Sequence, residues 1–311
     1  MKTKMGFEQC HPAVNLIYFA AVIAGTLTFR HPVWLGLSFL CACVYSIRRN
    51  GRRAVVFDLI LIPLAVAYAF YYSSYHHFGL TELGVNFVGN RITLESMVYG
   101  LVIAFSVAGA LIWMSCVHSV FTADKVVYLF GKVSPRLSLF LAILLRLVPR
   151  FKNEARKINT ARRGLGRGTD QGSFPRRVMN ALRIFSMLIS WCIGALATAS
   201  DSMRGRGSSL RGRKAFSIYR FDNRDRTYVV AMFACIAVTL MGHLLRQTRM
   251  IYDPRLLWTP VTGMSFFFWL CYTVLCLMPF GLEVWTEYRF EKARAAARIP
   301  AGKTAEKTDA A

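Results

Sequence analysis

The residues best suited to catalysis are sparse in this chain and form no complete motif. Its Gly-Lys-Thr triplet is Gly302-Lys303-Thr304. A phosphate-binding loop also needs a glycine five residues before Gly302, and Ala297 stands there in a polar segment that follows no strand. We therefore expect no catalytic residue in this chain and no ATP hydrolysis by it.

Residues that bind metals are present, but their spacing is unsuitable. None of the eight cysteines belongs to a CxxC or Cys/His motif, and His76 and His77 form a pair without further ligands. Asp58, Glu95 and Asp124 lie near the ends of apolar segments, where solvation at a membrane interface explains a carboxylate simply. We predict no metal site and no cofactor, with the cysteines acting as small apolar side chains.

Two clusters of arginine and glycine, about 40 residues apart, are the most distinctive feature. They are Arg162-Arg163-Gly164-Leu165-Gly166-Arg167-Gly168 and Arg204-Gly205-Arg206-Gly207. Arginine is favoured at a helix C-terminus by the helix dipole, and glycine lets the backbone turn and approach another surface. Helix capping and membrane orientation explain either cluster alone. The duplication favours two equivalent sites at which an arginine pairs with an acidic groove on a partner.

The composition places these clusters in a membrane protein. Of the 311 residues, 55% are hydrophobic and 18% are charged, whereas soluble domains average about 45–50% and about 25%. The net charge of +23 would ordinarily suggest nucleic acid, but Lys and Arg also orient membrane proteins. We therefore expect the lipid bilayer, and no nucleic acid, as a partner.

The apolar runs predict an all-α fold with about six transmembrane helices. A helix needs about 20 apolar residues to cross a bilayer, with a range near 17–25. Runs of suitable length cover residues 12–29, 32–47, 55–75, 94–120, 228–245 and 264–285. The proline at 63 and the one at 279 are tolerable, because neighbouring helices can satisfy the carbonyls that they free.

The basic residues of the short loops predict the orientation. Arg48, Arg49, Arg52 and Arg53 lie between the second and third runs, and the cytoplasmic side of a membrane collects such residues. This assignment places both termini and residues 124–226 in the cytoplasm. Residues 246–263 are the exception, because their three arginines would face outward.

The charge and the apolar runs together divide the chain into four regions. Residues 1–122 are expected to form an N-terminal membrane bundle, 123–226 a cytoplasmic region, 227–288 a membrane hairpin, and 289–311 a basic cytoplasmic tail. Between residues 124 and 226 there are 22 Lys or Arg against 6 Asp or Glu.

The cytoplasmic region also contains two apolar blocks that predict helices. The first begins at Ser134 and Pro135, is expected to end at Pro149, and is followed by a second helix over residues 149–161. The other block begins at Ser173 and is expected to end at Gly205 and Gly207. The first block is too short to span a bilayer, and Arg183 interrupts the other, so we expect both at the interface or under the bundle.

Several separated motifs resemble one family, the transmembrane T component of energy-coupling factor (ECF) ABC transporters. The similar stretches are residues 198–207 (TASDSMRGRG) and 212–222 (GRKAFSIYRFD), with weaker likeness at 145–152 and 92–100. The resemblance covers residues 90–226 well, and the flanking membrane runs only in pattern. The motifs occur in the order in which the family has them.

The resemblance implies a non-catalytic scaffold in the cell membrane of a prokaryote. In this family two long cytoplasmic coupling helices sit on two ABC-type ATPase subunits, and the membrane helices hold a separate substrate-binding S component. ATP hydrolysis in the partner subunits then drives uptake of a vitamin or a metal. The cargo itself is bound by the S component, so this chain does not name it.

The resemblance also implies an ATPase contact at each of two small-Arg-Gly motifs. Gly205-Arg206-Gly207 matches the second motif. The first departs from the pattern, because alignment on Ile158 and Ala161 puts Gly164-Leu165-Gly166 there, with leucine at the arginine position. In a shifted register the arginine is supplied by Arg162 or Arg163 with Gly164, or by Arg167.

Two other functions fit parts of the pattern. A polytopic enzyme acting on phospholipid or prenyl-phosphate groups would use the basic region to bind phosphate, although such chemistry usually needs paired carboxylates that hold a metal. A lipid-binding anchor or a channel would explain the charge, but it would leave the two Arg/Gly helix ends unexplained.

Overall fold

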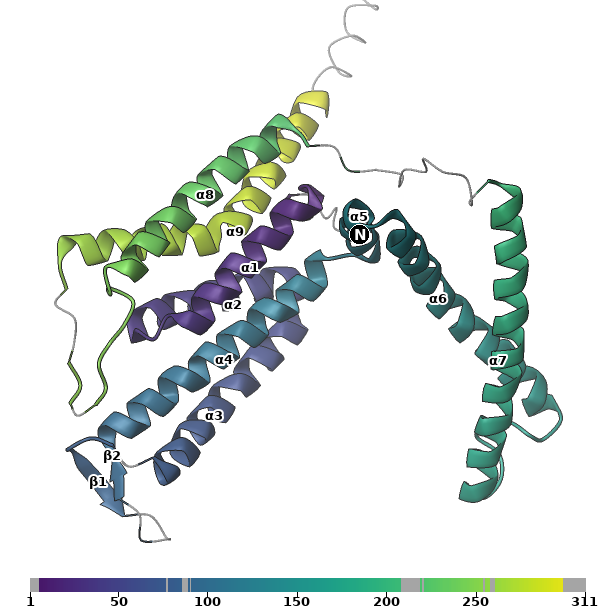
Figure 1. Cartoon of the computed structure of the whole chain (residues 1–311), viewed down its shortest axis with the longest axis horizontal. Helices are drawn as coiled ribbons and strands as arrows, with labels where there is room; N and C mark the ends of the chain where they lie inside the picture. Colours follow the sequence, from purple (N-terminus) through teal and green to yellow (C-terminus); the bar gives the residue numbers. More distant parts are fainter. Residues whose placement is uncertain are drawn as a thin grey trace, which may run out of the picture. The chain divides into compact units, whose positions relative to one another are not determined.

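The computed structural model describes residues 6–76, 78–85, 89, 91–207, 219, 221–253, 255–257 and 261–298 (Figure 1). This part of the chain is helical apart from one short hairpin. In chain order the elements are η1 (Phe7–Gln9), α1 (Pro12–Thr28), α2 (Pro32–Asn50), α3 (Arg52–Tyr75), β1 (Glu82–Val85), β2 (Arg91–Thr93), α4 (Leu94–Val120), α5 (Ala123–Val133), α6 (Pro135–Gly164), α7 (Phe174–Gly205), α8 (Asn223–Leu244) and α9 (Gly263–Arg298).

The chain divides into two compact units. Unit 1 comprises Met1–Thr122 and Tyr219–Ala311, and unit 2 comprises Ala123–Ile218. Unit 1 therefore joins α1 to α4 with α8 and α9, whereas unit 2 contains α5, α6 and α7. Helix α9 continues to Arg298, so residues 289–298 of the predicted tail are helical, and residues 299–311 lie outside the described part.

The six predicted spans coincide with α1, α2, α3, α4, α8 and α9, apart from Phe29 and Leu245, which lie one residue past the ends of α1 and α8. Among the described residues, five helices are long and apolar enough to cross a membrane, namely α3, α4, α7, α8 and α9, and α1 is a shorter apolar helix. Such an arrangement is that of an all-α polytopic membrane protein. Helix α7 has the length and composition of a span, although the sequence favoured a place at the interface, so the number of spans stays a prediction.

Helix α3 presents one buried face and one exposed apolar face. Leu61, Ala65 and Ala69 are buried where α3 packs against its neighbours, whereas Leu59 and Leu64 are among the large side chains exposed on the other face. Small residues let helices in a bilayer approach closely. At Gly100 of α4 an added Cβ would lie 3.2 Å from the Ala69 carbonyl oxygen, so this glycine is needed for the contact of α3 with α4.

Two helices of unit 1 begin at the same kind of cap. His11 precedes Pro12 at the start of α1, and His31 precedes Pro32 at the start of α2. The Nδ1 atom of His11 accepts the Ala13 N–H at 3.2 Å, and that of His31 accepts the Val33 N–H at 3.3 Å. Each imidazole therefore satisfies a backbone donor that a helix N-terminus otherwise leaves unpaired.

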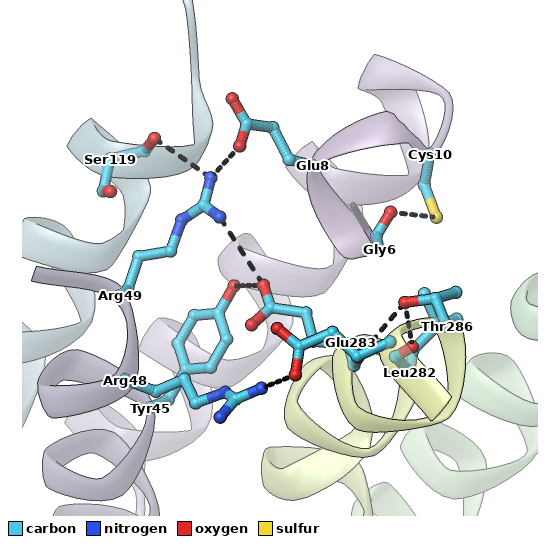
Figure 2. Close-up of polar contacts among 11 residues, drawn as sticks. Gly6, Glu8, Cys10, Tyr45, Arg48, Arg49, Ser119, Leu282, Glu283 and Thr286 are labelled. Carbon is cyan, nitrogen blue, oxygen red and sulfur yellow. Dashed lines mark hydrogen bonds and ion pairs between the residues drawn. The ribbon is translucent and has the colours of Figure 1, made fainter. Parts of the chain in front are cut away.

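A buried polar cluster joins the N-terminal segment, α2 and α9 (Figure 2). Arg49 of α2 forms an ion pair with Glu8, and its Nη1 lies 3.7 Å from Oε1 of Glu283 on α9. Tyr45 donates a hydrogen bond to the same Glu283 oxygen at 3.4 Å. The Arg49 side chain is only 9% exposed, so its charge is compensated inside the protein, where an unpaired charge would be costly.

The loop between α3 and α4 contains a two-stranded antiparallel hairpin that the sequence did not predict. Glu82 pairs with Thr93, and Val85 pairs with Arg91. The Glu95 side chain at the start of α4 turns back toward this loop, where its carboxylate accepts the Thr81 N–H at 3.3 Å. Glu95 is buried, so the prediction that it is solvated at an interface is wrong.

Candidate functional site

The two Arg/Gly clusters stand at the C-terminal ends of the two longest helices in unit 2. Helix α6 has 30 residues and α7 has 32, with Ser134 and Ser173 at their N-cap positions as predicted. Helix α6 runs through Pro149, so the predicted division into two helices is wrong. Proline removes one intrahelical hydrogen bond, here to the Leu145 carbonyl, and crowds the preceding turn, but its own fixed φ is a helical value, so α6 can continue through it.

Helix α7 ends at the predicted glycines. Gly205 is its last helical residue, and Arg206 is the C-cap, with φ −87° and ψ 11°. The Gly207 N–H then bonds to the Arg204 carbonyl at 3.0 Å, and Gly207 has φ +75°. That conformation favours glycine, which has no Cβ to clash with the backbone. Arg206 is therefore held in a turn and is exposed.

Helix α6 ends in the same way. Gly164 is its last helical residue, and Leu165 is the C-cap, with φ −94° and ψ 10°. The Gly166 N–H bonds to the Arg163 carbonyl at 3.0 Å, and Gly166 has φ +69°. Gly164-Leu165-Gly166 therefore matches Gly205-Arg206-Gly207 residue by residue, with Leu165 at the place of Arg206.

The alternative arginines of the first cluster have other contacts. Arg163 forms an ion pair with Asp170 in the loop after α6. Nε of Arg162 lies 3.4 Å from the Arg167 carbonyl oxygen, and the Arg162 carbonyl accepts the Arg167 N–H at 3.0 Å. Among the described residues Arg167 is exposed and its side chain has no ion pair. None of these three occupies the C-cap position that Arg206 has in α7.

The connection from α6 to α7, residues 165–173, is a folded loop. Asn159 of α6 accepts the Thr169 N–H at 3.1 Å, and Asn180 of α7 donates to the Gly168 carbonyl at 3.1 Å. Gly168 is buried, and an added Cβ would lie 2.4 Å from Cγ of Arg163. These contacts fix the α6 tip, defined as residues 164–166, relative to the start of α7.

The two tips are separated by the length of α7. A 32-residue helix rises by about 48 Å at 1.5 Å per residue. The α6 tip lies beside the start of α7, and the α7 tip, residues 205–207, lies at the other end (Figure 1). The structure therefore keeps the two clusters at separate helix ends and does not bring them into one site.

The remaining motif residues are only partly described. Residues 198–205 are helical and belong to α7, and residues 145–152 lie in the middle of α6. The stretch 92–100 covers the end of β2 and the start of α4. Most of residues 212–222 lie outside the described part of the chain, so this segment of the resemblance stays a prediction.

The other candidate residues do not converge on a site. Asp58 of α3 is buried beside Ser46 of α2, which makes its predicted interfacial solvation wrong. Asp124 is exposed, and His76 stacks on Tyr72, whereas His77 lies outside the described residues. Among the described residues no three His, Cys, Asp or Glu side chains are grouped to hold a metal.

Sequence reasoning missed the residues that hold the α6 tip in place. Asn159 and Asn180 fix the loop after α6 by side-chain bonds to its backbone. Asparagine is common in such local bonding, but its partners lie 10 and 12 residues away, and no short motif indicates that spacing. The charged pair of Arg163 and Asp170, seven residues apart, was the detectable sign of a folded loop.

Scans of the chain against protein-family models and against curated proteins found no match.

Proposed function

We propose that this chain is the transmembrane coupling subunit of an ATP-driven importer of the energy-coupling factor type. In this function two ABC-type ATPase subunits bind the cytoplasmic helices α6 and α7, and a membrane-embedded S component binds the cargo. The chain catalyses nothing itself and transmits motion. Its cytoplasmic orientation, its cell-membrane location and uptake of a vitamin or metal belong to the same proposal.

The observation that carries the proposal is the pair of matching helix ends. Two long helices end in the same glycine-closed turn, and about 48 Å of helix separates the two turns. That spacing suits two partner domains better than one small ligand. Because α6 and α7 are continuous helices, a displacement at either tip moves a rigid element, which is how packed helices pass on domain motion.

The charge at the α7 tip supports an acidic partner surface. Arg206 is exposed and, among the described residues, makes no ion pair. A guanidinium binds a carboxylate through two parallel hydrogen bonds, which is stronger and more specific than an ordinary surface contact. The exposed arginine is therefore available to a carboxylate on an ATPase subunit.

The test is complex formation with the ABC-type ATPases of the organism from which this chain comes. The chain is tagged, coexpressed with these ATPases and purified in detergent, and the bound ATPase per chain is measured. We expect two ATPase subunits per wild-type chain and at least a tenfold loss for Arg206→Glu. Arg156→Glu is the matched control, because Arg156 is exposed on α6, carries the same charge and lies away from both tips.

Different results would contradict the coupling function and the role of Arg206. A wild-type chain that purifies without ATPase subunits contradicts the coupling function. Full ATPase binding and full ATP turnover by the Arg206→Glu complex contradict the role of Arg206 alone. Equal losses for Arg206→Glu and Arg156→Glu would show that general positive charge, rather than the α7 tip, holds the partner.

A further inference from the structure

The two helix tips have the same backbone but different side chains at the same place. Leu165 and Arg206 are both C-cap residues, and their φ and ψ values differ by only a few degrees. Each is followed by a glycine with positive φ and preceded by a glycine in the last helical position. The tips therefore present their central side chains in equivalent positions, one apolar and one cationic.

Leucine is the group that projects from the α6 tip. Leu165 is 76% exposed, which places it among the most exposed large apolar side chains of the described residues. The neighbouring Arg163 has its charge compensated by Asp170 within the same loop. This pair offsets the charge of Arg163, whereas Arg167 stays exposed without an ion pair among the described residues, and Leu165 is the apolar group at the apex of the tip.

The glycines before the caps leave open space around both tips. An added Cβ at Gly164 or at Gly205 would meet no described atom within 4 Å. Neither glycine has the positive φ that would require it. Glycine in a helix costs roughly 0.5–1 kcal/mol relative to alanine, and among the described residues neither a positive φ nor a close contact requires glycine at these two positions. A glycine at a helix end also leaves room for the close approach of another molecule.

We propose that the two tips dock into partner surfaces of different chemistry. The α7 tip inserts Arg206 into an acidic socket, and the α6 tip inserts Leu165 into an apolar socket; a socket here is the partner groove that receives a tip. This inference rests on the proposed function, since the sockets belong to the two ATPase subunits. It makes the two contacts of the scaffold non-equivalent, although their backbones match.

The two sockets should not tolerate an exchange of side chains. A guanidinium placed in an apolar socket loses its hydration without gaining a partner, and buried unpaired charge is strongly unfavourable. A leucine placed in an acidic socket leaves carboxylates unpaired. Exchange therefore harms both contacts, whereas two sockets of the same acidic kind would accept, or even prefer, an arginine at position 165.

The experiment compares Leu165→Arg, Arg206→Leu and the double exchange with the wild-type chain, each coexpressed with the ABC-type ATPases of the same organism. We expect at least a tenfold loss of bound ATPase for each single variant and no recovery in the double exchange. Leu165→Met is the matched control and should bind within about twofold of wild type, because it keeps an apolar side chain of similar volume. Both positions are exposed, so folding should be unaffected.

Crosslinking gives a second measurement. A photoreactive residue at position 165 should capture a partner segment that is apolar, and the same residue at position 206 should capture one that carries carboxylates. Equal or tighter ATPase binding by Leu165→Arg overturns the inference and leaves the coupling function standing. Acidic segments captured from both positions overturn it as well. A wild-type chain that holds no ATPase overturns both proposals.

Discussion

Leu165 at the end of α6 occupies the position that Arg206 occupies at the end of α7. The equivalence is fixed by the backbone, since a 3.0 Å hydrogen bond joins the following glycine N–H to the carbonyl three residues earlier in both helices. Sequence alone did not decide whether Leu165 or one of three arginines in the first cluster corresponds to Arg206. The structure aligns the two helix ends without reference to side-chain type.

Replacing the last helical glycine with alanine should stabilise the isolated chain and weaken the complex. Gly164 and Gly205 have open surroundings and a conformation that alanine accepts. Each substitution should raise the free energy of unfolding by about 0.4–1 kcal/mol, as measured by thermal unfolding in detergent. Binding of the ATPases should fall, because the new methyl groups lie at the proposed contacts.

Alanine at Gly166 or Gly207, the glycines that follow the two C-cap residues, is the control and should change the free energy of unfolding in the opposite direction. Gly166 and Gly207 have φ of +69° and +75°, so alanine there should lower the free energy of unfolding by roughly 1 kcal/mol. Stabilisation at all four positions would contradict the turn geometry. Unchanged ATPase binding by the stabilised variants would contradict close approach at Gly164 and Gly205.

Gly168→Ala should disrupt the loop after α6. The added Cβ would lie 2.4 Å from Cγ of Arg163, so this side chain must move and release Asp170. We expect a loss of about 1–3 kcal/mol in the free energy of unfolding. Asp170→Asn, which removes only an exposed ion pair, should cost about 0–1 kcal/mol. Similar values for the two variants would show that Gly168 has no steric role.

The helices were predictable because long apolar runs require them. The run at 94–120 coincides with α4, and the ends of α7 follow from Ser173 at its start and Gly205 and Gly207 at its end. Local chemistry determined these boundaries, since caps and glycines act within a few residues. Local chemistry also misled at Pro149, where α6 continues through the proline.

Contacts between distant segments were not predictable. Arg49 was assigned to the set of charges that orient the protein, yet it is buried against Glu8 and Glu283, which lie 41 and 234 residues away along the chain. Residues this far apart that pair in the fold cannot be recognised from the spacing of residues in a single sequence. The hairpin of β1 and β2 was missed because its strands have only three or four residues, too few to show the alternation of apolar and polar residues that is typical of a strand.

Removing Arg49 should be far more costly than removing its neighbour. Arg49→Met leaves Glu8 and Glu283 without their cation in a buried site, and breaking a buried pair costs about 3–5 kcal/mol. Arg48 pairs with Glu287 in a partly exposed position, so Arg48→Met should cost about 0–1 kcal/mol. Both values come from thermal unfolding in detergent. Equal losses would show that the cluster does not hold α2 to α9.

Acidification should weaken unit 1 through His31. This residue lies in the turn between α1 and α2, and burial lowers its pKa because the charged imidazole loses hydration. The unfolded chain therefore binds a proton at a higher pH than the folded one, and the stabilisation is fully present above the ordinary histidine pKa of about 6.5. As pH falls below that value, the free energy of unfolding should decrease. Protonation also removes the Nδ1 acceptor that caps α2.

His31→Asn separates this effect from the other histidines. Asparagine keeps an acceptor for the Val33 N–H and cannot titrate in this range. The variant should lose less stability than the wild-type chain between pH 7 and pH 5, as measured by thermal unfolding in detergent at a series of pH values. If both chains lose stability equally, protonation of His31 is not linked to unfolding, and the acid sensitivity arises at another group.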